Sequence, residues 1–329
     1  MKAIVNNRYG PPNVLEHVEI EKPSPKNNEI LVSIKATTVT TADCMMRRGD
    51  TFISRILLGF SRPKKKYQIL GTEFSGVIES MGNKVSLFKP GDQVCAFRGF
   101  GTGCYAEYKC IKENASIALK PENMNFAEAA SFVDGATTAL FFLKDKANIS
   151  KGQKVLINGA SGSIGSFAVQ LTKNLGAEVT GVCSTKNIEM VKALGADHVI
   201  DYTKTDFTKT GALYDIIFDT VSKSSFSQCK SSLKYGGKYI VTVMSFKRVV
   251  LSFLTKLCKK RKLIFALSVN KTEGLKYIKP LIEKGHLKTV IDRHYKLNEI
   301  SHAHKYVEEG HKRGNVVIEI QNNESTTAH

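Results

Sequence analysis

Residues 158–170 read NGASGSIGSFAVQ: small residues fill the first half, and the apolar spacing of a helix fills the second. A short apolar stretch with the composition of a buried strand comes directly before them. The glycines Gly159, Gly162 and Gly165 are spaced three residues apart. Ala160 stands where the G-x-G-x-x-G fingerprint has its first glycine. A strand, a glycine-rich turn and a helix are the setting in which that fingerprint binds a dinucleotide.

Each part of this turn has a physical reason for its residues. Gly162 lets the backbone approach a pyrophosphate, and Gly165 lets the helix pack closely on the strand. The free N–H groups at the start of the helix favour negative charge. We therefore expect the cofactor to contact Ser161, Gly162, Ser163 and Ile164. The alternative is a turn that is tight for packing alone.

The chain around this turn alternates between strands and helices from residue 152 to residue 269. Strands are expected at 154–157, 178–183, 198–200, 214–218, 237–243 and 263–269, and helices at 164–175, 187–194 and 226–233. This alternation predicts an α/β fold with a doubly wound parallel sheet.

The residues after the second expected strand bear on which dinucleotide is bound. An acidic residue there would bind the ribose 2′-hydroxyl of NAD. The sequence instead has Ser184, Thr185 and Lys186, which supply two hydroxyls and a cation for a 2′-phosphate. We therefore predict NADPH rather than NADH as the cofactor. The alternative is that these are ordinary polar residues of a loop.

The rest of the chain is expected to be rich in β-structure. Strands at 30–36, 73–81 and 93–97 are separated by turns that contain glycine and proline. A helix is expected at 300–309, followed by a last strand at 316–320. Residues after 320 are polar and are expected to be disordered.

Composition limits the possible partners. The net charge is +18, but the lysines are dispersed and no nucleic-acid motif accompanies them, so we expect no nucleic-acid partner. No apolar run approaches the roughly 20 residues of a membrane span, and the N-terminus lacks the apolar core of a signal peptide. We therefore expect no membrane association and a cytoplasmic protein. His302 and His304 fall on different faces of a helix, and we expect both at the surface without a metal.

Longer motifs extend the interpretation to nearly the whole chain. They are MKAIV followed by YGPPNVL, ILGTEFSGVIESMGNKVSLFKPGDQV, YAEY, AASFVDGATTAL, VLINGASGSIG, LGADHVIDY and AHKYVEEGHKRGNVVI. In these motifs the chain resembles the medium-chain dehydrogenase/reductases, and among them the zinc-independent quinone oxidoreductase and alkenal/enone reductase branch. The resemblance implies a GroES-like, β-rich catalytic domain at 1–127 and 270–329, and a Rossmann NADP-binding domain at 128–269. It also implies a homodimer or homotetramer.

The resemblance identifies three positions that decide metal binding. Alcohol dehydrogenases of this family hold catalytic zinc with Cys, His and Cys, and this chain has Thr40, Thr72 and Asp134 at those positions. Two hydroxyls and one carboxylate suit zinc poorly, because zinc favours thiolate and imidazole. We therefore predict no zinc and a reaction that needs no Lewis acid. Hydride transfer to a hydrophobic quinone or α,β-unsaturated carbonyl is such a reaction.

Three residues are the expected catalytic set. Thr40 and Asp43 stand where this branch has an N-x-x-D stretch at the active-site wall, with Thr40 in place of the usual Asn, and Tyr67 precedes the ILGTE motif. The alternatives are packing roles for Thr40 and Tyr67, and, for Asp43, a turn-forming role or a contact with a ribose. Residues 50–67 are apolar enough to form a lid over a hydrophobic acceptor, or else a helix packed on the domain surface.

The resemblance also implies cofactor contacts beyond the glycine turn. Thr138 matches a threonine near the nicotinamide ribose, and Tyr202 matches a tyrosine near the adenine ribose phosphate. The further expected contacts are Thr220, Val243, Phe265, Leu267 and Asn315.

The sequence thus predicts an NADPH-dependent, zinc-independent reductase of quinones or α,β-unsaturated carbonyls. Two alternatives remain open. One is a relative of the zinc-type alcohol dehydrogenases, and the other is a non-catalytic protein of the same fold that binds NADPH or nucleic acid.

Overall fold

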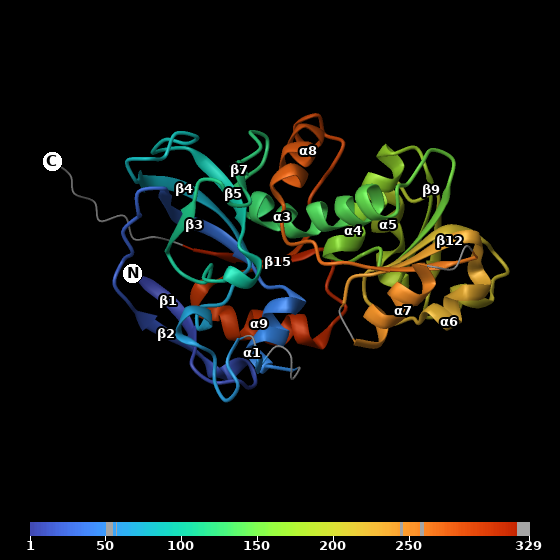
Figure 1. Cartoon of the computed structure of the whole chain (residues 1–329), viewed down its shortest axis with the longest axis horizontal. Helices are drawn as coiled ribbons and strands as arrows, with labels where there is room; N and C mark the ends of the chain where they lie inside the picture. Colours follow the sequence, from blue (N-terminus) through green and yellow to red (C-terminus); the bar gives the residue numbers. More distant parts are fainter. Residues whose placement is uncertain (51–54, 57, 244–245, 257–259, 321–329) are drawn as a thin grey trace. The chain divides into compact units, whose positions relative to one another are not determined.

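A computed structural model describes residues 1–50, 55–56, 58–243, 246–256 and 260–320 (Figure 1). The chain divides into two compact units. The first, called the β-rich unit, comprises Met1–Asp134, Asn270–Glu283 and Ile291–His329. The second, called the Rossmann unit, comprises Gly135–Val269 and Lys284–Val290.

The Rossmann unit is built on one six-stranded parallel sheet with the strand order β10-β9-β8-β11-β12-β13. Its strands are β8 (Lys154–Asn158), β9 (Glu178–Cys183), β10 (His198–Asp201), β11 (Tyr214–Asp219), β12 (Leu233–Val241) and β13 (Lys262–Phe265). Parallel strands are covered on both faces, which is why Val155, Leu156 and Ile157 of β8 are apolar and fully buried. The strand order reverses between β8 and β11, the point at which such sheets bind ligands. The predicted α/β fold is confirmed.

Short helices connect the strands of this sheet. They are α4 (Ser163–Asn174), α5 (Ile188–Ala193), α6 (Phe226–Cys229) and α7 (Phe246–Lys256). The helix expected at 226–233 continues after α6 as a 3-10 helix, Lys230–Ser232, and was wrong only at its last residue, because Leu233 is fully buried and begins β12. The last strand is also shorter than expected and ends at Phe265, because the chain beyond it becomes exposed at Leu267 and Val269.

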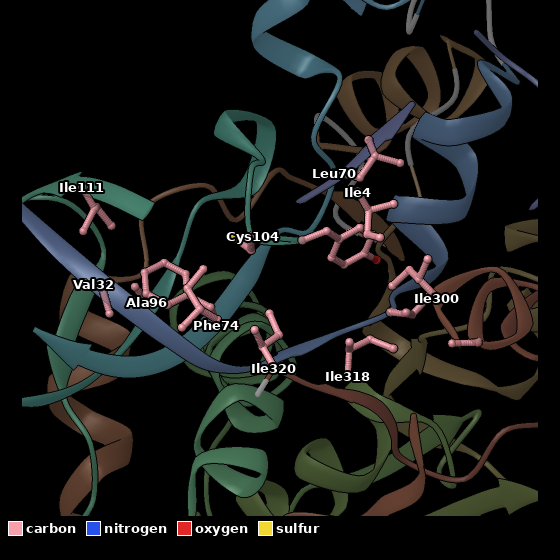
Figure 2. Close-up of a cluster of buried hydrophobic side chains, with 14 of the residues drawn as sticks. Ile4, Val32, Leu70, Phe74, Ala96, Cys104, Ile111, Ile300, Ile318 and Ile320 are labelled. Atoms are coloured by element: carbon pink, nitrogen blue, oxygen red, sulfur yellow. The ribbon is translucent and has the colours of Figure 1, made fainter. Parts of the chain in front are cut away.

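The β-rich unit contains a seven-stranded sheet with the order β14-β15-β3-β4-β5-β7, in which β6 also pairs with β3, and a separate pair β1-β2. Its strands are β1 (Lys2–Asn6), β2 (Leu15–Glu19), β3 (Glu29–Thr38), β4 (Glu73–Met81), β5 (Gln93–Phe97), β6 (Tyr108–Lys112), β7 (Ile117–Leu119), β14 (Ile291–Lys296) and β15 (Asn315–Glu319). Its helices are α1 (Thr41–Arg48), α8 (Thr272–Glu283) and α9 (Ile300–Glu309). Figure 2 shows the core of this unit, a buried cluster that includes Val32, Phe74 and Ile318 of the seven-stranded sheet together with Ile4 and Ile300 from other elements.

Helix α3 (Phe126–Leu140) continues as a π-helical turn, Phe141–Lys146, and was not predicted from the sequence. By length and composition alone this continuous helix is long and apolar enough to cross a membrane, contrary to the expectation that no apolar run reaches that length. Its apolar window is 72% buried, as in the core helix of a globular protein.

The boundary between the units differs from the expected division in two places. It falls after Asp134, inside α3, rather than after residue 127, and Lys284–Val290 belong to the Rossmann unit. Residues 321–329, expected to be disordered, lie outside the described residues, as do residues 51–54 and 57 of the expected lid.

Candidate active site

The glycine turn between β8 and α4 has the geometry of a phosphate cradle. Gly159 adopts a left-handed φ of +83°, and a Cβ on Gly165 would lie 2.0 Å from the carbonyl oxygen of Gly159. Gly165 is therefore needed for close packing. A Cβ on Gly162 would meet only that same oxygen, at 3.4 Å, so the space in front of Gly162 is open. Gly162 is the N-cap of α4 and no side chain caps this helix. The turn therefore fits a dinucleotide pyrophosphate, which would fill that space and accept from the first N–H groups of α4.

The ends of β8 and β11 are tied together beside this turn. The Thr220 hydroxyl donates to the carbonyl of Asn158 at 2.8 Å, and the Asn158 side-chain amide donates to Asp219 at 3.1 Å. Asp219 is fully buried and also accepts from the Tyr239 hydroxyl at 2.9 Å. Val221, directly after Thr220, is 45% exposed at this edge of the sheet. Asn158 and Asp219 thus stabilise the edge at which a cofactor would lie.

The residues expected at the ribose phosphate lie at the neighbouring strand ends. The backbone N–H of Tyr202 donates to the carbonyl of Cys183, which brings the exposed Tyr202 next to Ser184 and Thr185. The fold also brings a carboxylate there that the local sequence did not show. The Thr185 hydroxyl donates to Asp201 of β10 at 2.5 Å, and the Thr203 hydroxyl donates to the same carboxylate at 2.7 Å.

The remaining expected cofactor contacts are spread over several elements. Thr138 is nearly buried on α3, one helical turn after Gly135, where an added Cβ would lie 2.8 Å from the Ser163 hydroxyl. This packing brings Thr138 toward the glycine turn. Ser161 accepts a hydrogen bond from Asn187, and Ser163 and Ile164 begin α4 half-buried. Four of the expected contacts have exposed or half-exposed side chains: Lys186, Val243, Phe265 and Leu267. Asn315 is buried at the start of β15 in the β-rich unit.

Thr40 and Asp43 of the β-rich unit are hydrogen-bonded to each other. Thr40 caps α1, and the two residues form a capping box: the Thr40 hydroxyl accepts from the Asp43 N–H, and the Thr40 N–H donates to the Asp43 carboxylate at 2.9 Å. Asp43 is fully buried, also accepts from the N–H of Gly71 at 3.2 Å, and burial raises its pKa to about 6. This geometry favours the turn-forming alternative for Asp43. A substrate contact by Thr40 stays a prediction.

Tyr67 is half-buried and packs against the core of the β-rich unit, with the Lys66 ammonium 4.6 Å from its ring centroid. This environment favours the alternative in which Tyr67 has a packing role. In the described part of the expected lid, Leu58 is buried in the core and Phe60 is 67% exposed. Neither feature tests the lid, which stays a prediction.

The three positions that hold zinc in alcohol dehydrogenases do not fit that metal here. Thr40 is engaged in the capping box, and Thr72 presents a hydroxyl. The Asp134 carboxylate is occupied by a cation already, because the Lys271 ammonium lies 3.0 Å from it and is 1% exposed. Within residues 1–50, 55–56, 58–243, 246–256 and 260–320, no three His, Cys, Asp or Glu side chains are grouped to hold a metal ion. The donor chemistry therefore disagrees with a zinc site.

Comparisons with known proteins agree with this architecture. The family model described as alcohol dehydrogenase GroES-like domain matches residues 26–122, and the one described as zinc-binding dehydrogenase matches residues 194–318. The chain is 34% identical to the chloroplastic quinone-oxidoreductase QR1 of Triphysaria versicolor, over 97% of this chain and 98% of that protein. The chain belongs to the medium-chain dehydrogenase/reductase superfamily. Within this superfamily it is an oxidoreductase of the quinone oxidoreductase and alkenal reductase branch.

Two further relatives define the branch. The NADPH-dependent alkenal/one oxidoreductase of Arabidopsis thaliana is 29% identical over 97% of this chain and 79% of that protein. The structure of the quinone oxidoreductase from Coxiella burnetii is similar with a TM-score of 0.88, at 30% identity, over 98% of this chain and 99% of that one. The expectation of a cytoplasmic protein is contradicted, because the similar plant and mouse proteins are chloroplastic or mitochondrial, which points to an organelle.

One buried acid was not singled out from the sequence. Glu73, at the start of β4, accepts from the Thr38 hydroxyl at 2.5 Å and from the Asp134 N–H at 2.7 Å. Burial, and then the neighbouring Asp134 carboxylate, raise the pKa of Glu73 to about 8. The position of Glu73 directly after Thr72 was the only local feature of the sequence that could have marked it as a site residue. No local feature of the sequence marked Lys271, because it is 137 residues from Asp134 and its burial depends on the tertiary fold.

The expectation that His304 lies at the surface is wrong. His304 is fully buried on α9, with Nε2 3.2 Å from the Tyr105 hydroxyl and Nδ1 3.4 Å from the Cys44 thiol. Burial, and then the guanidinium groups of Arg47 and Arg48, lower the pKa of His304 to about 3. His304 is therefore a neutral core residue at physiological pH, while His302 on the other face is exposed.

Proposed function

We propose that this protein is an NADPH-dependent reductase that transfers hydride to a quinone or an α,β-unsaturated carbonyl without a catalytic metal. The observation that carries the proposal is the Asp134 carboxylate at the position of a zinc ligand, paired with the Lys271 ammonium. Quinones and enones delocalise the incoming charge onto oxygen, so they need less polarisation than an alcohol or a saturated aldehyde.

The residues of the Rossmann unit support the nicotinamide cofactor. When bound, reduced nicotinamide supplies the hydride. Gly162 and the uncapped start of α4 would bind its pyrophosphate. Ser184, Lys186 and Tyr202 would bind the 2′-phosphate, which is the reason for proposing NADPH. The net charge of +18 would raise the encounter rate with this anionic cofactor.

The experiment follows NADPH oxidation by nicotinamide absorbance, with and without a metal chelator. The acceptors are a benzoquinone, a naphthoquinone, an enal, an enone and a saturated aldehyde. We expect turnover with the quinones or the unsaturated carbonyls, unchanged by the chelator, and little with the saturated aldehyde. Loss of turnover with the chelator, or preference for the saturated aldehyde, would overturn the metal-free proposal. Tight NADPH binding with no acceptor reduced would favour a non-catalytic protein.

A further inference from the structure

Helix α7 of the Rossmann unit, labelled in Figure 1, presents apolar side chains to solvent. On its inner side, the Ser252 hydroxyl donates to the carbonyl of Leu263 and the Thr255 hydroxyl accepts from the Leu263 N–H, both at 3.0 Å. Four exposed apolar residues share the outer side and are called the α7 face: Val249 and Val250 at 42%, Leu254 at 56% and Phe253 at 71% exposed. A surface helix ordinarily turns its apolar stripe inward. The α7 face therefore has the composition of a contact surface.

The sequence around this helix contains no acidic residue. Residues 220–269 have eleven lysines and arginines and no aspartate or glutamate, so this segment supplies more than half of the net charge of +18. The eleven are Lys223, Lys230, Lys234, Lys238, Lys247, Arg248, Lys256, Lys259, Lys260, Arg261 and Lys262. Lys234 is paired with Asp215 of β11 at 2.7 Å. The even dispersal of lysines expected from the sequence thus does not hold for this part of the Rossmann unit.

Three of these cations follow the C-terminal end of α7 and are called the basic segment, residues 260–262. Lys260 is exposed, and Arg261 and Lys262 are half-buried. The carbonyl of Lys260 accepts from the N–H of Gly236, and the Nε of Arg261 donates at 2.8 Å to the first carbonyl of β12. Tyr235, next to Gly236, is 73% exposed. The basic segment is therefore fixed beside an exposed aromatic ring.

A second copy of the chain fits this surface poorly. Symmetric dimers bring the same surface of two subunits together, so the basic segment of one copy would approach that of the other. Strand pairing between copies would use the free edge of β13, the last strand of its sheet. At Leu263 of that strand, both backbone groups are already bonded to α7. Charge and hydrogen bonding both favour a different partner.

The chemistry of the surface distinguishes the anionic partners. Nucleic acid matches the charge, but it is bound by stacking on aromatic rings, and Val249, Val250 and Leu254 are aliphatic. A membrane with anionic lipids offers headgroups to the cations and acyl chains to the aliphatic side chains. Tyrosine is also enriched at membrane–water interfaces, which suits the exposed Tyr235.

We infer that the α7 face and the basic segment form a docking surface for a membrane that contains anionic lipids. With 11 residues, α7 is far shorter than the roughly 20 that cross a bilayer, so it lies in the interface without spanning it. The expectation of no membrane association was based on spanning segments and signal peptides, and neither bears on such a surface. The inference does not depend on the proposed catalytic activity.

The α7 face is tested with a single tryptophan, because the chain has none. Phe253→Trp places it on the α7 face, and the matched control Leu87→Trp places it at a position 67% exposed in the β-rich unit. The full chain is mixed with phosphatidylcholine vesicles with or without phosphatidylglycerol. We expect the emission of Phe253→Trp to shift to the blue with phosphatidylglycerol vesicles, and that of Leu87→Trp to stay unchanged.

Three results of this experiment would overturn the inference. In the first, neither tryptophan responds to the vesicles. In the second, the emission of Phe253→Trp shifts without vesicles as the protein concentration rises, which would assign the α7 face to a second copy. In the third, single-stranded RNA shifts the emission and the vesicles do not, which would assign the surface to nucleic acid.

The basic segment is tested by vesicle flotation of Lys260→Glu and of its control Lys112→Glu, which changes another exposed lysine and alters the net charge equally. We expect Lys260→Glu to bind phosphatidylglycerol vesicles about tenfold more weakly and Lys112→Glu to bind like the native protein. Equal weakening of both would mean that the vesicles attract the whole basic protein, and the docking surface would be wrong.

A conservative pair of variants guards against misfolding. Lys260→Gln removes the charge alone and should bind between the native protein and Lys260→Glu, whereas Lys260→Arg should bind like the native protein. Leu254→Ser should weaken binding about fivefold through the lost apolar contact, while Leu87→Ser should not. If Leu254→Ser and Leu87→Ser both bind like the native protein, the α7 face does not enter the membrane and the inference fails.

Discussion

The Rossmann unit and the β-rich unit place their polar groups in different ways. In the Rossmann unit the glycine turn presents backbone N–H groups at the start of α4, and no charged side chain lies in the turn itself. In the β-rich unit the polar groups are charged side chains: the buried Glu73 and the half-buried Asp134 with the buried ammonium of Lys271. A backbone site requires small residues next to one another. A side-chain site requires charges that compensate each other across the fold, so the two should respond differently to mutation.

The largest effect is expected where a buried charge loses its partner. Lys271→Met removes the ammonium that is 3.0 Å from Asp134 and that offsets the charge of this carboxylate beside Glu73. Breaking a buried ion pair costs about 3–5 kcal/mol. We expect a loss near the lower end of this range, because the Asp134 side chain is 31% exposed. Urea unfolding measures it.

The control is the double variant Asp134→Asn with Lys271→Met. It removes both charges and should recover most of the lost stability. If the double variant is as unstable as Lys271→Met, the loss comes from the packing of the lysine stem and its contact with the Phe97 ring, and the β-rich unit does not depend on this charge pair.

Glu73 should make stability depend on pH in the opposite sense to an ordinary surface acid. Its pKa is raised from 4.5 to about 8 in the folded chain, so the folded state holds a proton that the unfolded state releases. The stabilisation is complete below about pH 4.5 and is lost as pH rises toward 8, at about 1.4 kcal/mol for each pKa unit. Glu73→Gln, which mimics the protonated acid, should flatten stability over this window. Equal pH profiles of the two proteins would mean that Glu73 is ionised in the fold.

In the Rossmann unit, the corresponding structural test is Gly165→Ala. Its Cβ would lie 2.0 Å from the carbonyl oxygen of Gly159 and 2.9 Å from the Cα of Ala160, both backbone atoms that cannot move aside cheaply. Overpacking of this kind costs about 1–3 kcal/mol. We expect lower stability in urea whether or not a cofactor is present. Unchanged stability would show that α4 shifts on β8 without cost.

Gly162→Ala tests the same turn without that clash. The new methyl group would meet only one atom, at 3.4 Å, so the free protein should keep its stability. The methyl group would lie where the pyrophosphate approaches, and we expect NADPH to bind about tenfold more weakly, or about 1.4 kcal/mol. Fluorescence titration measures this. Unchanged affinity would contradict the cradle and favour a turn that is tight for packing alone.

These differences explain what the sequence could and could not predict. The strand of Glu178–Cys183 and the helix of Ile300–Glu309 were predicted to the residue, because apolar periodicity and flanking turns are local. The helix α3 was missed because it is apolar on nearly every side and so lacks an amphipathic pattern. The burial of His304 and Lys271 was missed because it depends on partners far away in the sequence, such as Tyr105 and Asp134.

The smallest effect concerns cofactor choice, where the fold adds a carboxylate that the local sequence lacked. Asp201 accepts from the Thr185 hydroxyl at 2.5 Å, next to the residues expected to bind the 2′-phosphate. Two negative groups so close repel each other, although solvent screens exposed charges strongly. Asp201→Asn should therefore raise the ratio of kcat/KM for NADPH to that for NADH, by about three- to fivefold.

The matched control for this change is Asp206→Asn. Asp206 stands in the same local motif, accepting from the N–H and hydroxyl of Thr208 as Asp201 does from Thr203, but has no bond to Thr185. A rise in the cofactor ratio with Asp201→Asn alone would locate the 2′-phosphate beside Thr185. Equal ratios in both variants would place the phosphate elsewhere. The Rossmann unit would then select its cofactor through the backbone turn, and the contrast with the charged β-rich unit would become sharper.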